Sequence, residues 1–133
     1  MLSLVAGSMV HADLCHDIRA IGTEFAKTTL TLPETGKTAE CTRSRVLAGG
    51  SQMHCGWAFS YRSPAAAQAF EHLLVTVADC LGAAARVTAD KTVNHPDFYD
   101  LQTFQFEGQE IGVSLKDKAA LSETYVFLRV KLP

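Results

Sequence analysis

Two stretches of the chain place apolar residues at helical spacing. The first begins at Asp13 and extends to about Leu30, shortly before Pro33, which prevents a helix from continuing. The second begins at Ser63-Pro64, a typical N-cap followed by a proline in the first turn, and stops at Gly82. The apolar positions that recur at intervals of three and four residues are Leu14, Ile18, Ile21 and Phe25 in the first stretch and Phe70, Leu73, Leu74, Val77 and Leu81 in the second. The pattern predicts two amphipathic helices.

Most of the remaining chain alternates between apolar and polar residues, as β-strands with one buried face do. The clearest case is the segment 52–62, where one face carries Cys55, Trp57, Phe59 and Tyr61. Further strands are expected over residues 39–47, 84–89, 99–107, 110–115 and 125–132, with turns over Asp90–Asp97 and at Gly108-Gln109 and a connecting loop over Lys116–Glu123.

The predicted order of elements is α-β-β-α-β-β-β-β. Neighbouring strands joined by short hairpins form antiparallel sheets, and each helix must bury its apolar stripe against such a sheet. We therefore expect an α+β fold in which both helices pack on one face of an antiparallel sheet of about five to six strands.

Composition and charge narrow the class of protein further. The 133 residues include 47% hydrophobic and 20% charged residues, which suits one compact domain over residues 13–133. Twelve lysines and arginines against fourteen acidic residues leave a net charge of −2, so the charge gives no reason to expect nucleic-acid binding. No stretch reaches the roughly 18 apolar residues that a membrane-spanning helix needs.

The first twelve residues resemble the end of a secretory signal peptide. Leu2–Ala6 is an apolar run, and Val10-His11-Ala12 has the spacing of a cleavage site before Asp13. The basic segment that normally opens such a peptide is missing, so an alternative is a first helix that starts early. We expect residues 1–12 to be a residual signal peptide and the protein to be exported, to the periplasm or the extracellular space.

Four widely spaced cysteines agree with export. Cys41 and Cys55 flank a predicted hairpin. Placing them opposite each other puts Val46 opposite Gly50, with a short loop between, which is a common hairpin geometry. The hairpin register therefore predicts the disulfide Cys41–Cys55, and elimination leaves Cys15–Cys80. Because Arg43 and Arg45 share the face of Cys41, we also expect the hairpin tip to project beyond the core.

Candidate catalytic groups are few. Cys55 could act as a nucleophile with His95 and Asp97 completing a triad, although a strand does not provide the helix N-terminus that activates such thiols. The five histidines form no pair with metal-ligand spacing, so we expect no metal site and no cofactor.

The residues left as candidates for binding lie in a turn segment and at a strand end: His95, Asp97, Tyr99, Lys116 and Lys118. Extending the alternation of Phe104 and Phe106 backwards puts Tyr99 on the solvent side and Phe98 inside. A tyrosine on the solvated side of a sheet suits a protein–protein contact.

We therefore favour a small exported, non-enzymatic binding protein of the inhibitor, immunity or accessory-subunit type, whose partner is another protein. One alternative is a small exported enzyme that uses Cys55 or an Asp/His set. Another is a structural envelope component or homo-oligomer, with a sheet face or edge covered by a second copy.

Overall fold

A computed structural model describes residues 14–21, 23, 28–47, 49–82, 85–94 and 97–132. For residues 92–94 and 132 it describes the backbone only. A first helix covers residues 14–21. The later elements are β1 (Thr29–Thr31), β2 (Thr38–Arg45), β3 (Ser51–Ser60), α2 (Pro64–Leu81), β4 (Arg86–Asn94), β5 (Asp97–Phe106), β6 (Gln109–Lys118), the 3-10 helix η1 (Ala119–Leu121) and β7 (Glu123–Leu132).

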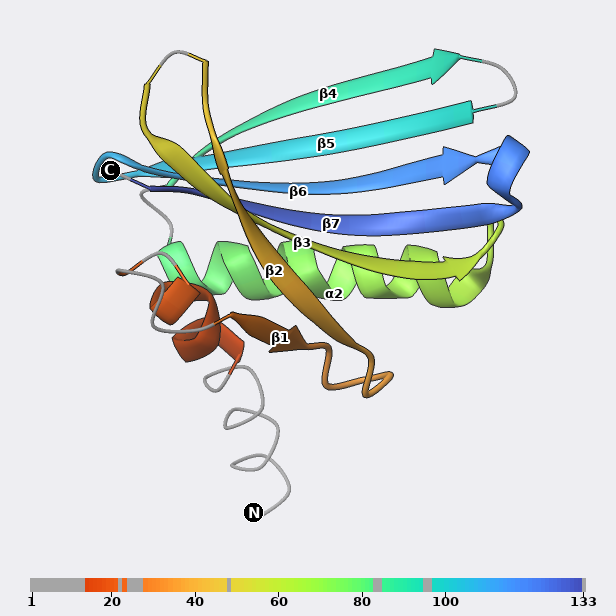
Figure 1. Cartoon of the computed structure of the whole chain (residues 1–133), viewed down its shortest axis with the longest axis horizontal. Coiled ribbons are helices and arrows are strands. Elements are labelled where there is room, and N and C mark those ends of the chain that lie inside the picture. The colour runs from red at the N-terminus through yellow and green to blue at the C-terminus, as the bar shows by residue number, and fades with distance from the viewer. Residues whose placement is uncertain are drawn as a thin grey trace.

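The described strands form one antiparallel sheet in the order β1-β2-β3-β7-β6-β5-β4. After β3, α2 carries the chain across the sheet to β4 at the far edge, and successive hairpins then fill the sheet back toward β3 (Figure 1). The α+β class is confirmed, while the sheet has seven strands instead of the five to six expected. The first helix lies beside the C-terminal end of α2, on the same side of the sheet (Figure 1).

Helix α2 begins and ends where the local sequence predicts. The Ser63 side chain accepts a hydrogen bond from the backbone N–H of Ala66 at 3.3 Å, and Pro64 occupies the first turn. Gly82 follows the last helical residue with a φ of 84°, a conformation that glycine adopts without strain. The helix therefore presents one continuous apolar stripe to the sheet.

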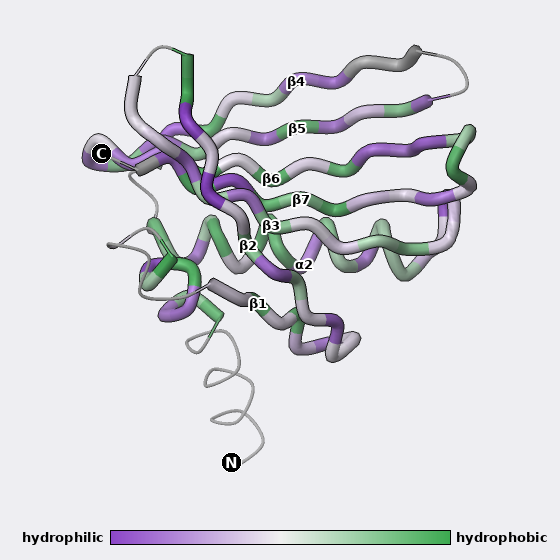
Figure 2. Tube along the Cα trace, in the orientation of Figure 1, coloured by the Kyte–Doolittle hydropathy of each residue, from purple (hydrophilic) through white to green (hydrophobic). Residues whose placement is uncertain are grey.

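The strand register separates the two faces of the sheet. One face packs against α2 and is here called the core face. It carries the buried side chains of β3, β5, β6 and β7, namely Met53, Cys55, Trp57, Phe59, Phe104, Ile111, Val113, Val126, Leu128 and Val130. The opposite face is here called the open face. Figure 2 shows hydrophobic residues along α2 and the middle of β7, and more hydrophilic residues along β4 and β5.

Three segments differ from the sequence-based expectation. The first predicted helix was extended to Leu30, but Thr29–Thr31 form β1 and pair with Thr38–Glu40 of β2. Threonines favour strands because their branched Cβ restricts the side chain, and alternation still buries Leu30 between two exposed neighbours. The helical spacing alone did not reveal this change.

The other two differences lie in predicted loops. Residues 90–94 were expected in a turn-rich segment, but they continue β4 and pair with β5. The predicted loop Lys116–Glu123 is also shorter, because β6 runs to Lys118 and only η1 and Ser122 separate it from β7. Both segments are polar, so strand pairing with β5 and β7 holds them extended despite their loop-like composition.

Candidate functional site

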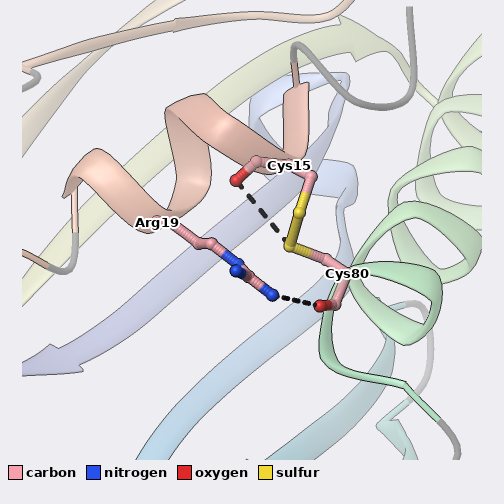
Figure 3. The surroundings of a disulfide bond; sticks show 3 residues. All are labelled: Cys15, Arg19 and Cys80. Carbon is pink, nitrogen blue, oxygen red and sulfur yellow. Dashed lines mark hydrogen bonds between the residues drawn. A yellow bond between two sulfur atoms is a disulfide. The ribbon is translucent and has the colours of Figure 1, made fainter. Parts of the chain in front are cut away.

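The structure contains the two disulfides that the sequence predicts. Cys15–Cys80 joins the first helix to the last turn of α2, with a Cα–Cα distance of 5.5 Å. Arg19 adds to this junction, because its guanidinium donates a 2.7 Å hydrogen bond to the carbonyl oxygen of Cys80 (Figure 3). The bridge and the hydrogen bond therefore hold the first helix at one end of α2.

The second disulfide, Cys41–Cys55, crosses between directly opposed residues of β2 and β3. Cys55 is fully buried, and its sulfur is bonded to that of Cys41, so it offers no nucleophilic thiol in this structure. Two intact disulfides are compatible with an oxidising location. Among the described residues, no group of three or more His, Cys, Asp or Glu side chains could hold a metal ion.

The structure describes four of the five sequence-predicted binding residues, and they do not form one cluster. Tyr99 and Lys116 are opposed on β5 and β6, and the Lys116 ammonium lies 5.7 Å from the centre of the Tyr99 ring on the open face. Asp97 has a structural role, since its carboxylate accepts a 3.0 Å hydrogen bond from the backbone N–H of Ala119 at the start of η1. Lys118 lies opposite Glu123 of β7. His95 is outside the described residues.

The alternation argument placed Tyr99 and Phe98 on the correct faces, because the register puts Tyr99 on the open face and Phe98 on the core face. Phe98 is nevertheless only half-buried, as Tyr99 is. Phe98 lies near the start of β5 beside the edge strand β4, where burial is incomplete. Phe98 therefore points inward as predicted, but it is not among the buried core residues.

The middle of the open face carries a row of aromatic rings. The Phe127 ring stacks on Tyr125 at 5.6 Å between centres and lies 4.9 Å from the His54 ring. Phe127 also covers Gly56 on β3, because a Cβ at that glycine would come within 2.8 Å of two ring carbons. Burial, together with the charge of Arg129, lowers the pKa of His54 below its ordinary value of 6.5.

The tip of the β2–β3 hairpin was expected to project beyond the core, but none of its residues was among the predicted binding residues. The tip is defined here as Val46, Leu47, Gly49 and Gly50. Leu47 is fully exposed, whereas the Gly50 carbonyl accepts a 3.1 Å hydrogen bond from Val46, as the predicted register requires. A signal in the sequence was the leucine in Leu47-Ala48-Gly49-Gly50, because a large apolar residue in a predicted turn has no core to enter.

Two exposed arginines precede this tip on β2. Arg43 and Arg45 lie on β2 opposite Met53 and Ser51, which are buried, so only the β2 side of the hairpin extends past the core. Residues 43–51 contain no aspartate or glutamate. The hairpin end therefore combines one exposed leucine with a local positive charge in a chain whose net charge is −2.

A groove of about 920 Å³ separates the tip from the β5–β6 turn. Its lining includes Gly49 and Gly50 of the tip and Glu107 and Gly108 of the β5–β6 turn. Its base is a row of open-face residues opposed across four strands: Arg86, Gln105, Glu110 and Lys131. The groove is thus polar and carries both signs of charge, next to the exposed leucine.

Comparison with known proteins finds no matching family model, no matching curated protein and no matching solved structure. No helix in the described part of the chain is long and apolar enough to cross a membrane.

Proposed function

We propose that this protein is an exported, non-enzymatic binding protein that inserts the tip of its β2–β3 hairpin into a pocket of a partner protein. The observation that carries the proposal is the full exposure of Leu47 at the end of a hairpin whose strands are bonded through Cys41–Cys55. A leucine held in water has no role in the protein's own core. Burying such a side chain in a partner stabilises a complex by about 2 kcal/mol.

The hairpin supports this role because its conformation is restrained before binding. The disulfide joins the two strands four residues before the end of β2, and the Val46 and Gly49 hydrogen bonds close the turn. A restrained loop loses less conformational freedom on association than a flexible loop does. This arrangement suits the inhibitor type of binding protein, in which a preformed loop enters a cleft.

The flanking charges indicate the chemistry of the partner. Arg43 and Arg45 are next to the leucine, and guanidinium groups form bidentate pairs with carboxylates. The partner is therefore a protein with an apolar pocket whose rim carries aspartate or glutamate side chains. Tyr99, Lys116 and Lys118 lie toward the other end of the open face and are proposed as a secondary contact.

The test uses site-specific photo-crosslinking in cells that produce the full chain. Benzoylphenylalanine at position 47 should give a discrete protein adduct, whereas the same group at Val75, which is 50% exposed on α2 and belongs to neither proposed contact, should not. The adduct should disappear when Arg43→Glu and Arg45→Glu are added. The proposal is overturned if positions 47 and 75 give the same products, if neither gives a product, or if the arginine substitutions leave the adduct unchanged.

Two measurements complete the test. Once the adduct identifies the partner, Leu47→Asp should weaken the purified complex by at least about tenfold, because a charged residue cannot enter an apolar pocket. An affinity of Leu47→Asp for the partner equal to that of the unchanged protein would contradict insertion of Leu47. Export itself is tested by fractionation and intact mass, which should show a product that begins at Asp13.

A further inference from the structure

Strand β4 ends the sheet, and no described strand pairs with its outer edge. It has nine residues, Arg86–Asn94, whereas the opposite edge strand, β1, has only three. An unpaired strand edge presents N–H and C=O groups to any strand that lies beside it. We propose that β4 pairs with β4 of a second copy of this chain, antiparallel, so that the sheet continues across a two-fold axis.

Charge selects the register of this pairing. A two-fold axis perpendicular to the sheet keeps both open faces on one side, so each residue must lie opposite a residue of the same face. The open-face residues at the start of β4 are Arg86, Thr88 and Asp90. If Thr88 lies opposite Thr88 of the second copy, Arg86 lies opposite Asp90 of the second copy. The two-fold axis repeats this arrangement, so the interface contains two Arg86–Asp90 pairs.

Two alternative registers oppose like charges, and those centred on Val87 or Ala89 lack the Arg86–Asp90 pair. A register centred on Asp90 places two carboxylates opposite each other, and one centred on Lys91 places two ammonium groups together. Like charges that are directly opposed destabilise a strand pair, whereas opposite charges stabilise it. The register centred on Thr88 is therefore the one that the charges of β4 favour.

The core face of β4 supplies a second reason for pairing. Val87 is 52% exposed, although it lies on the face that α2 covers elsewhere. It borders a hollow of about 670 Å³ that Ala78 and Gly82 line at the C-terminal end of α2 and Phe104 lines on β5, so the end of the helix leaves Val87 partly uncovered. In the proposed register Val87 lies opposite Ala89 of the second copy, so pairing removes exposed apolar surface from water.

Lys91 is the residue that could oppose this pairing, since an inward-facing charge often protects an edge strand. Its ammonium lies 3.8 Å from the carboxylate of Asp100, a buried residue on the neighbouring β5, so the charge is held within its own sheet. In the register centred on Thr88, Lys91 lies opposite Ala85, at the end of the paired segment. The charge is therefore outside the centre of the interface.

Sedimentation velocity over a wide range of protein concentration tests the proposal. The full chain should self-associate, and Arg86→Asp or Asp90→Arg should each weaken the dimer by about tenfold or more, because two attractive pairs become repulsive. The double variant Arg86→Asp/Asp90→Arg restores the opposite charges and should restore the dimer. A monomer at every concentration, a dimer insensitive to Arg86→Asp, or a double variant without rescue would each overturn the proposal.

Arg45→Asp is the matched control, because it also reverses an exposed arginine on a strand of the same sheet. It should leave the dimer unchanged while it reduces the partner adduct at position 47. Asp90→Arg, at a position that does not line the groove beside the tip, should instead weaken the dimer and leave the adduct at position 47 unchanged. The proposal that the hairpin tip binds a partner and the proposal that β4 pairs with a second copy can therefore fail separately. Circular dichroism melting of each variant verifies that the comparison is made between folded proteins.

Discussion

Asp117 is a buried carboxylate at the end of β6, and its removal should cost more stability than any exposed charge. The residue is 5% exposed. One carboxylate oxygen accepts a 3.0 Å hydrogen bond from the Arg62 Nε, and the other accepts a 2.8 Å hydrogen bond from the Thr124 hydroxyl. The backbone N–H of Arg62 donates to that same hydroxyl at 2.8 Å. The network therefore joins the β3–α2 turn, β6 and β7.

The size of the effect follows from what Asp117→Ala leaves behind. The Thr124 hydroxyl, in a residue only 1% exposed, would lose its acceptor, which costs about 1–3 kcal/mol. The Arg62 side chain is 51% exposed, so water replaces much of its ion pair, and we add only about 0.5–1 kcal/mol for it. We expect the free energy of unfolding to fall by about 3 kcal/mol. Asp117→Asn keeps an acceptor for Thr124 and should lose about 1 kcal/mol.

Urea unfolding followed by tryptophan fluorescence measures this loss. Trp57 is the single tryptophan and is 3% exposed, so its emission should shift strongly when the core opens. Glu71→Ala, at an exposed position on α2, is the control and should change stability by less than about 0.5 kcal/mol. A loss for Asp117→Ala that matches the control would refute the argument that the network stabilises the fold.

Removing Cys15–Cys80 should lower the free energy of unfolding by about 4 kcal/mol, and removing Cys41–Cys55 by about 3 kcal/mol, because the first closes 65 residues of chain and the second 14. Urea titration of the two double-alanine variants checks this order, and a reversed order would contradict it. His54 is expected to make stability depend on pH, because burial and a neighbouring arginine lower its pKa in the folded state. The unfolded chain then binds a proton first, so this contribution is present above about pH 6.5 and is lost as the pH falls through the lower pKa of the folded protein. His54→Gln should flatten that part of the stability profile, and an unchanged profile would disprove the assignment.

Local patterns determined the elements whose signals lie close together in the sequence. Ser63, Pro64 and Gly82 define α2 because caps act over one helical turn. The pairing of Cys41 with Cys55 follows from a hairpin, in which a short turn sets the register for both strands. These features need no knowledge of distant residues, so the sequence alone predicts them.

Only the tertiary structure decided which polar segments become strands and where exposed groups lie. Residues 90–94 resemble a turn, yet β5 pairs with them. Asp117 resembles a loop residue, yet its carboxylate is bound by two side chains. Arg62 comes from the distant β3–α2 turn, and Thr124 lies on the next strand, β7. A strand gains its hydrogen bonds from a neighbour that can be far away in sequence, and burial depends on every element packed nearby. For the same reason the position of β4 at the edge of the described sheet emerges only after the strands have assembled.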